Sequence, residues 1–258
     1  METQKETIYE DKDFQCYKIG RIGVIKIIKN IFEIVTDLPE SSNFISVMND
    51  LENDKTVEAI LFLNEKGSLG NEEYLTYLKQ VLAHNEMGKE WSNIEITNRK
   101  TRTRELVILN TIITKIVLSE KLIVTGLRGE IVTPFFGASL AADIRFATDD
   151  VVFLLSHLQM NIHPSGALPF FLPRYIGHAK ASQILFNGEE VTVTEAMELA
   201  IIQEILPIEN YEKLCIEKIN QIFLKGENVI SCTKRLLNFN FEDLDKYLGM
   251  EECNYIRK

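Results

Sequence analysis

The sequence has little cysteine, no long apolar run and no excess of positive charge, and each shortage excludes a class of protein. Its 258 residues include only four cysteines, and no two of them form a CxxC pair: Cys16, Cys215, Cys232 and Cys253. This spacing provides neither a disulfide framework nor a metal site, so we expect reduced thiols in a cytoplasmic protein that holds no metal. No apolar run reaches about 18 residues, the minimum for a membrane span. The polar N-terminus, METQKETIYEDKDF, lacks the pattern of a signal peptide.

The charge balance argues against binding to nucleic acid. The chain carries 28 Lys and Arg against 38 Asp and Glu, which gives a formal net charge of -10 at pH 7. A nucleic-acid surface needs a basic footprint, which this composition does not supply. With 45% hydrophobic and 26% charged residues, the composition is that of an ordinary globular protein. No glycine fingerprint of a dinucleotide site is present, so we expect no redox cofactor.

Apolar periodicity predicts strands that alternate with helices. Residues 14–28 alternate around a glycine, as in a hairpin, and 57–64 and 121–129 are short apolar runs typical of buried strands. Apolar residues at helical spacing predict helices at 44–54, 71–85, 103–119 and 135–144. Farther along the chain we expect strands in IRFAT, VVFLL and IIQEILP, short helices at 178–187 and 194–200, and a helical tail at 209–247.

This alternation predicts an α/β fold with right-handed crossovers, in which ligands bind at the carboxyl ends of the strands. Two glycine-bearing loops follow predicted strands and lead into helices, NEKGSLGNEE at 64–73 and GLRGEIVTPFFG at 126–137. Each loop can direct backbone N–H groups and a helix dipole at one oxygen. If the two loops face each other, they would form an oxyanion hole.

The second half of the chain resembles the crotonase (enoyl-CoA hydratase/isomerase) superfamily. KLIVTGLRG is similar to the strand that leads into the glycine-rich loop of that family, and SLAADIRFATDDVVF resembles its D-I-R-x-A-x-x-x-A-x-F segment. NIHPSGALPFFLPRYIGHAKASQILFNG is similar to the proline- and glycine-bearing segment that follows it. The first half matches more loosely, through VEAILFLNEKGSLGNEEYL, which looks like a shortened form of the family's strand and F-x-x-G-x-D loop.

The resemblance implies a crotonase-like (ClpP/crotonase) α/β fold, a spiral of β-β-α units with a C-terminal helical segment. It divides the chain into a core domain at 1–205 and a helical trimerisation segment at 206–258. It also implies a homotrimer or hexamer that acts on an acyl-CoA thioester, or on an acyl carrier, with no other cofactor. Two backbone N–H groups would stabilise the enolate-like charge on the thioester oxygen.

Several site positions depart from the family pattern. One oxyanion donor falls on Asn71, and the glycine triplet that supplies the other falls on Thr133, Pro134 and Phe135. Proline has no N–H, so this donor either moves to Thr133 or Phe135 or is missing. The two catalytic glutamates of the hydratases fall on Gly137 and His157, so hydration by two carboxylates is not expected.

The remaining candidates follow from these positions. His157 titrates near neutral pH and could move a proton, and Glu130 beside the loop is a second candidate acid or base. The substrate-binding positions implied by the resemblance are Gly70, Phe136, Gly137, Pro164 and Gly166. The basic run RKTRTR at 99–104 is either a solvated helix start or a patch for the phosphates of CoA.

Two functions therefore stay open at the level of sequence. One is an enzyme with altered acid/base chemistry, in which His157 moves the proton. The other is a catalytically inactive homologue that binds a thioester or serves as an assembly subunit. An open pocket near His157 would favour the enzyme, and a site filled by Phe135 or Phe136 would favour the inactive homologue.

Overall fold

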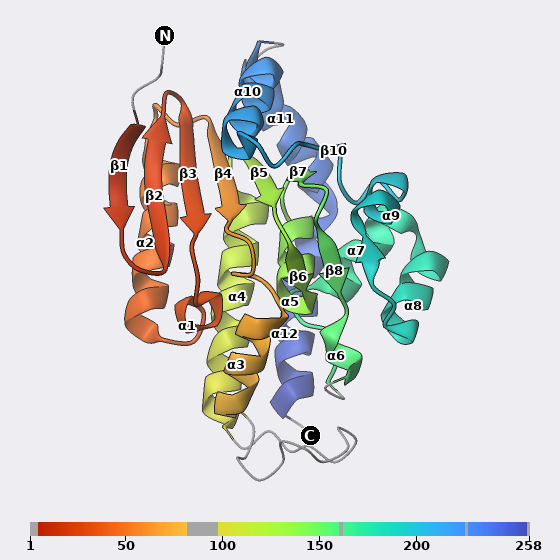
Figure 1. The fold of residues 1–258 in the computed structure, drawn as a ribbon. Coiled ribbons are helices and arrows are strands. Elements are labelled where there is room, and N and C mark those ends of the chain that lie inside the picture. Colours follow the sequence, from red (N-terminus) through yellow and green to blue (C-terminus); the bar gives the residue numbers. More distant parts are fainter. Residues whose placement is uncertain (1–4, 82–97, 160–161, 225–226, 257–258) are drawn as a thin grey trace.

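A seven-stranded mixed sheet forms the centre of the molecule, and a small three-stranded sheet lies beside it (Figure 1). The computed structural model describes residues 5–81, 98–159, 162–224 and 227–256. The large sheet has the order β1-β2-β3-β4-β5-β7-β10, antiparallel from β1 to β3 and parallel from β3 onward. Its strands are β1 (Lys5–Glu10), β2 (Phe14–Ile19), β3 (Ile22–Ile27), β4 (Ala59–Asn64), β5 (Leu122–Leu127), β7 (Ile144–Ala147) and β10 (Glu204–Ile205). The small sheet consists of β6 (Glu130–Val132), β8 (Val152–Leu154) and β9 (Val191–Thr192).

The helices surround these sheets, and none of those in the described ranges is long and apolar enough to cross a membrane. The helices of the first half are α1 (Ile31–Ile34), α2 (Leu38–Asn53), α3 (Asn71–Val81), α4 (Arg99–Leu118) and α5 (Thr133–Leu140). Those of the second half are α6 (Ser156–Gln159), α7 (Leu168–Ile176), α8 (His178–Asn187), α9 (Val193–Glu198), α10 (Tyr211–Phe223), α11 (Glu227–Leu237) and α12 (Glu242–Ile256), with the 3-10 turn η3 (Asn238–Phe241) before α12.

The central strands are buried on both faces, which explains their continuous apolar sequences. In β4, Ile60 joins the larger hydrophobic cluster, which it shares with α2 and α4. The alternate residues Leu61 and Leu63 join the second cluster, which they share with α10. The C-terminal helices therefore complete the core of the sheet: α10 covers one face, and α12 lies beside α4 (Figure 1).

The structure confirms most of the predicted elements. The hairpin at 14–28 is β2 and β3, the two buried strands are β4 and β5, and the helix at 178–187 is α8. Residues 82–85 of the predicted helix 71–85 lie outside the described residues.

Two other predicted boundaries are wrong. The helix predicted at 135–144 is α5, which ends at Leu140, because Asp143 instead accepts a hydrogen bond from Ile123 N (2.7 Å) at the start of β5. The strand predicted in IIQEILP is reduced to the two residues of β10.

Helix α7 has no counterpart among the predicted elements, and its two prolines explain why. Proline usually disfavours a helix interior, but Pro169 lies in the first turn, where no N–H is needed. Pro173 lies inside the helix, one turn after Pro169. Because proline has no N–H, the helix lacks only the one hydrogen bond that residue 173 would donate to the carbonyl of Pro169. The helix ends at Gly177, whose positive φ of 76° suits glycine.

Arg145 is a fully buried cation that joins β7 to the segment before β10. Its Nε donates to Ile201 O (2.5 Å), its Nη1 donates to Ala142 O (2.6 Å), and its guanidinium lies 4.6 Å from the ring centre of Tyr175. Burial lowers the pKa of this arginine. The two carbonyl groups have no access to water here, so their hydrogen bonds depend on this one side chain.

We expect Arg145→Met to lower the free energy of unfolding by about 2–4 kcal/mol, because two buried carbonyl groups lose their donor. Urea unfolding followed by circular dichroism would measure the change. Arg235→Met, at an exposed position of α11, is the matched control and should shift stability by under about 0.5 kcal/mol. Equal effects of the two substitutions would contradict the structural role assigned to Arg145.

Candidate active site

The two glycine-bearing loops lie side by side at the carboxyl ends of β4 and β5, as the sequence predicted (Figure 1). Val132, the last residue of β6 within the loop 126–137, donates its N–H to Leu69 O in the loop 64–73 (3.0 Å). This hydrogen bond fixes the starts of α3 and α5 next to each other. The structure therefore brings together the two backbone segments expected to form an oxyanion hole.

One expected oxyanion donor already has a partner in the protein. Asn71, the first residue of α3, donates its N–H to Oε2 of Glu130 (3.1 Å). Glu130 is exposed on β6, and its carboxylate lies so close to Gly70 that a Cβ on that glycine would be 3.2 Å from Oε2. A negative charge at a helix N-terminus is favourable. The Glu130 carboxylate therefore occupies the place at the start of α3 that an anionic oxygen of a ligand would take.

The other expected donor position is occupied by the start of α5. Pro134 is the second residue of this helix, where a missing N–H is tolerated. The hydroxyl of Thr133, which is 1% exposed, lies 3.2 Å from both Leu154 O and His157 Nδ1, and its single proton can be donated to only one of them at a time. The glycine loop of the family pattern is thus replaced here by the first turn of a buried helix.

His157 is enclosed and contacts the protein through both ring nitrogens. Its Nδ1 lies 3.2 Å from Thr133 Oγ1, and its Nε2 lies 3.3 Å from Leu185 O. Because a carbonyl oxygen only accepts, Nε2 carries the proton in this arrangement. Burial lowers the pKa of His157, so the ring is neutral at pH 7 and joins α6 to α5 and α8.

Backbone fills the space beside Gly137, the position of the first family glutamate. A Cβ on Gly137 would lie 2.2 Å from Gly166 O and 2.7 Å from Leu168 N. Gly166 has φ of +72°, and a Cβ there would lie 2.0 Å from Pro134 O. The segment 166–168 therefore lies directly against α5, and no side chain of any kind fits at Gly137. Pro164, just before this segment, is half-buried.

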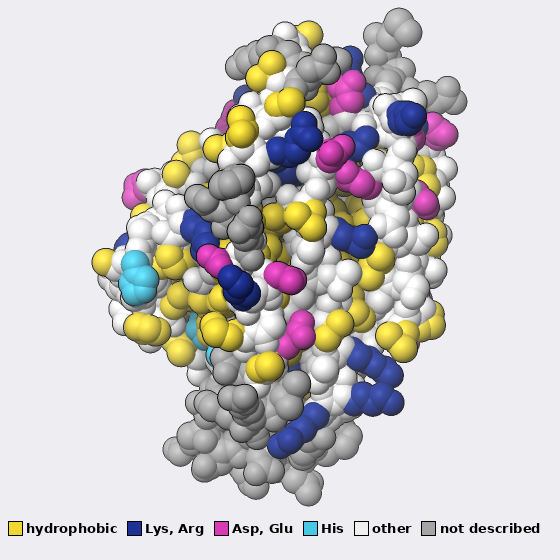
Figure 2. Space-filling model, turned by 180° about the vertical axis from the view of Figure 1, so that it is seen from behind, with side chains coloured by type: hydrophobic (Ala, Val, Ile, Leu, Met, Phe, Trp, Pro, Cys, Tyr) yellow, Lys and Arg dark blue, Asp and Glu magenta, His cyan; other side chains and the backbone are white. Residues whose placement is uncertain are grey.

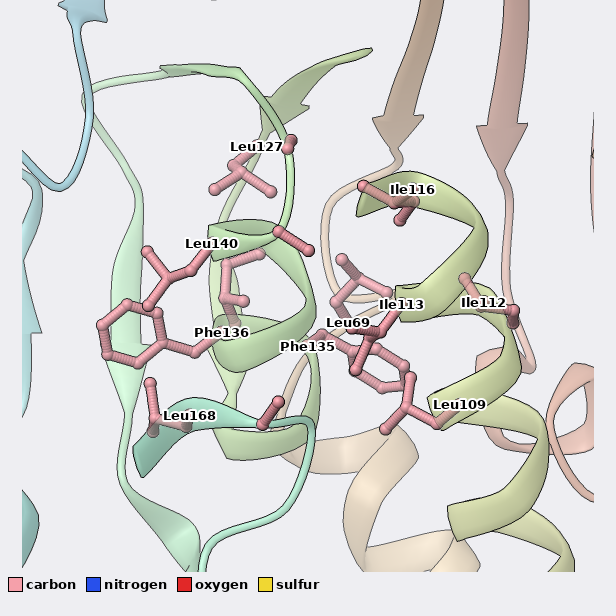
Figure 3. Close-up of a cluster of buried hydrophobic side chains, with 14 of the residues drawn as sticks. Leu69, Leu109, Ile112, Ile113, Ile116, Leu127, Phe135, Phe136, Leu140 and Leu168 are labelled. Carbon is pink, nitrogen blue, oxygen red and sulfur yellow. The ribbon is translucent and has the colours of Figure 1, made fainter. Parts of the chain in front are cut away.

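Apolar side chains occupy the space between α4 and α5 (Figure 3). Phe135 points from α5 toward Leu109 and Ile113 of α4, and Phe136 points to the opposite side of α5. Phe136 is fully buried with its ring centre 4.2 Å from that of Phe153. The two phenylalanines are therefore core residues in this structure, which is the arrangement expected of a filled site.

The structure also shows a buried acidic cluster that the sequence did not reveal. Glu251 of α12 is 3% exposed, and its Oε2 accepts the N–H of Ala167 (3.2 Å) in the segment that lies against α5. Glu105 of α4 is fully buried, pairs with Arg102 and accepts the hydroxyl of Tyr77 (3.3 Å). Burial raises the pKa of Glu105, and it raises the pKa of Glu251 to about 7.

Arg102 belongs to the basic run that was interpreted as a solvated helix start or a phosphate patch. Arg102 is 3% exposed and points into the core, so it belongs to neither. Arg99 and Lys100 are exposed at the start of α4, and for them both interpretations stay predictions. The spacing of Arg102 and Glu105, three residues apart on one helix, was the available signal for an internal ion pair. Glu251 lies 146 positions after Glu105, and no local pattern connects them.

Comparison with known proteins identifies related sequences and folds. A family model described as Enoyl-CoA hydratase/isomerase matches residues 90–253. The chain is 19% identical over 237 residues to the short-chain-enoyl-CoA hydratase of Clostridium acetobutylicum, covering 91% of this chain and 84% of that protein. It is 23% identical over 111 residues to the mouse peroxisomal enoyl-CoA delta isomerase 3, and the match covers 43% of this chain and 35% of that protein. For two Bacillus subtilis relatives, the matched segment spans only 45% and 32% of their length.

Solved structures show the same fold. The enoyl-CoA hydratase of Bacillus halodurans superposes with a TM-score of 0.73 at 20% identity, covering 98% of this chain and 95% of that chain. The enoyl-CoA hydratase/isomerase of Cupriavidus metallidurans CH34 superposes with a TM-score of 0.72 at 16% identity, covering 96% of this chain and 88% of that chain. These similarities confirm the predicted crotonase-like α/β fold class.

Gly137→Ala should lower the free energy of unfolding by about 3 kcal/mol or more, because the new Cβ would overlap backbone atoms that cannot move independently. Thermal and urea unfolding would measure the loss. Gly249→Ala is the control, because nothing lies within 4 Å of its Cβ in α12, and it should raise stability by about 0.5–1 kcal/mol. A Gly137→Ala protein as stable as the wild type would show that segment 166–168 does not lie against α5.

Glu251→Gln should change how stability depends on pH. The carboxyl has an ordinary pKa of 4.5, which burial raises to about 7 in the folded state. The folded protein thus holds an extra proton between these values, and stability falls as the pH rises through them, by about 3 kcal/mol in total. The neutral amide of the variant does not lose a proton, so this loss of stability is absent. The variant should therefore unfold at a higher urea concentration than the wild type at pH 8, and at about the same urea concentration near pH 5. Glu198→Gln, at an exposed position of α9, makes the same charge change and is the control. If the dependence of stability on pH is the same for the wild type and both variants, the raised pKa of Glu251 is contradicted.

Proposed function

We propose that this chain, which belongs to the enoyl-CoA hydratase/isomerase family, is a catalytically inactive member that serves as an assembly subunit. The observation that carries the proposal is the hydrogen bond from Asn71 N–H to the carboxylate of Glu130. A thioester oxygen that develops negative charge would have to displace a full negative charge from this donor. The second family position, Pro134, offers no N–H that could compensate.

The acid/base positions support the same proposal. Hydration requires one group that activates water and another that passes a proton to carbon. Gly137 has no side chain and no room for one, and His157 is neutral and enclosed between Thr133 and Leu185 O. The buried carboxyl of Glu251 is bound to Ala167 N, on the far side of segment 166–168 from Gly137.

Exposed apolar side chains on the C-terminal helices support a role in assembly. Exposure ranges from 61% to 86% for Leu224, Val229, Leu236, Leu237 and Met250. Apolar groups gathered on a surface commonly mark contacts with another protein. We propose that residues 206–258 hold a homotrimer or hexamer together in the cytoplasm, a setting that suits the exposed thiols of Cys232 and Cys253.

An enzyme with altered chemistry is the second candidate, and Glu130 is the observation that favours it. Its carboxylate is exposed at the meeting point of the two loops, where a thioester would lie in the family's site. If a ligand displaced it from Asn71, the same carboxylate would stand beside the reacting carbons as an acid or base. This candidate requires turnover that depends on Glu130.

The proposal predicts no turnover together with self-association. Crotonyl-CoA and a 3-enoyl-CoA, incubated with the pure protein, should be hydrated or isomerised no faster than in buffer, and Glu130→Ala should change nothing. Sedimentation velocity should give the mass of a trimer or hexamer. Leu237→Glu should weaken this association by ~tenfold or more, because it buries a charge at the contact.

Phe186→Glu is the matched control for the association, because Phe186 is 78% exposed on α8, away from the C-terminal helices. It should leave the mass unchanged. Turnover that Glu130→Ala abolishes would establish the enzyme and overturn the inactive assignment. A monomeric wild-type protein would overturn the assembly role.

A further inference from the structure

The strand β1 forms an open edge of the seven-stranded sheet. It pairs with β2 on one side, and all of its six residues except Tyr9 are exposed. No element that the structure describes lies outside β1 (Figure 1), and in the view from behind this edge forms the right-hand border of the molecule (Figure 2). The backbone N–H and C=O groups on the free side of such a strand can pair with a further strand.

A bulge in β1 decides which of its side chains share a face of the sheet. The strand is paired with β2 up to Thr7 and again from Tyr9, so Ile8 is an extra residue with no residue opposite it. Side chains along a regular strand alternate between the two faces. Because the extra residue interrupts this alternation, Lys5 and Glu10 lie on the same face, although regular alternation would place them on opposite faces.

Two side-chain contacts agree with this placement. The Nζ of Lys5 lies 3.7 Å from the ring centre of Tyr17, and Glu10 Oε1 accepts a hydrogen bond from Nε2 of Gln15 (2.7 Å). Tyr17 and Gln15 are two residues apart on β2, so their side chains share a face. Both charged side chains of β1 are exposed, and Lys5 forms no ion pair with any described residue. A cation and a carboxylate therefore stand at the two ends of one face of this edge.

This arrangement makes β1 complementary to itself. In an antiparallel pair of two β1 strands with the two-fold axis at Thr7, each Lys5 lies opposite the partner subunit's Glu10. The two threonines lie opposite each other at the axis, and threonine pairs are favourable in sheets. An axis at Glu6 would instead place two carboxylates opposite each other and separate Lys5 from the partner subunit's Glu10.

A bulge and a lysine on an edge strand commonly prevent pairing with other strands. In the symmetric pair, however, the bulge is what brings Lys5 and Glu10 onto one face, and each lysine meets a carboxylate. A strand of another protein would need the opposite charges at the same two positions. The charge pattern therefore favours a second copy of this chain over an unrelated strand.

We propose that β1 pairs with β1 of a second copy of this chain in an antiparallel two-fold contact, which continues the seven-stranded sheet from one subunit into the next. This contact is separate from residues 206–258 and goes beyond the assembly role proposed for them. A closed hexamer needs a two-fold contact in addition to a three-fold one, and β1 supplies the two-fold contact. Two six-residue strands bury less than the roughly 1,200–2,000 Å² of a stable complex, so this contact alone should be weak.

Charge reversal tests the proposal in the full-length protein, by sedimentation equilibrium over a wide range of protein concentrations. Lys5→Glu and Glu10→Lys each place like charges opposite each other, so each should weaken the β1 contact ~tenfold or more. The double variant Lys5→Glu/Glu10→Lys restores opposite charges and should associate within ~threefold of the unreversed protein. Measurement in the Leu237→Glu background, where the C-terminal contact is weakened, isolates the β1 contact, and circular dichroism checks that every variant is folded.

A cysteine at the axis locates the contact in the otherwise wild-type assembly. Residues directly opposite in an antiparallel pair have Cβ atoms about 4.5–5.5 Å apart. After the exposed Cys232 and Cys253 are replaced by serine, Thr7→Cys should therefore give a covalent dimer with a short bismaleimide. Thr103→Cys makes the same change at an exposed position of α4 and should give little of this product.

Four results would overturn the proposal. They are a Leu237→Glu protein that stays monomeric at the highest concentration, association that the single reversals leave unchanged, a double variant that does not recover association, and equal cross-linking of Thr7→Cys and Thr103→Cys. Failure of the C-terminal contact alone is distinguishable from these results. In that case the wild type itself should be a dimer, and Lys5→Glu should dissociate it.

Discussion

The contact between α5 and segment 166–168 is the constraint on which the rest of the candidate site depends. Backbone meets backbone there, with Gly166 against Pro134 O and Gly137 against Gly166 O, so neither glycine has room for a side chain. Glu251 reinforces the contact, because it accepts the N–H of Ala167 on the side of segment 166–168 that faces away from Gly137. Close packing transmits such a constraint, since a core without voids cannot admit one side chain unless another moves.

Several departures from the family pattern become consistent once this contact is in place. Pro134 begins a buried helix, Phe135 and Phe136 fill the space on both sides of α5, and His157 becomes a link between helices. One of the expected oxyanion donors, Asn71 N–H, is occupied by Glu130. On the proposed function, these changes together leave a family fold whose site is filled by its own residues.

Local patterns predicted most of the fold and the edge of the sheet where the two glycine-bearing loops meet. The apolar runs of β4 and β5 and the loops after them identified the sheet and the edge where the loops meet, because strand burial follows from a few adjacent residues. The state of the site depended on contacts between distant segments. Neither the lack of room at Gly137 nor the bond from Ala167 to Glu251 has a sequence signal, because each needs the positions of segment 166–168 and α12. Helix α7 was not predicted, because its two prolines interrupt the pattern typical of a helix interior.

The amide chemical shift of Asn71, measured in ¹⁵N-labelled protein during titration with acetoacetyl-CoA, tests directly whether a thioester can reach this donor. We expect this resonance to stay in place, because the Asn71 N–H remains bonded to the Glu130 carboxylate. A progressive shift of the Asn71 amide, reproduced by Glu130→Ala without ligand, would show that a thioester displaces the carboxylate. That result would contradict the claim that this site is filled by the chain itself.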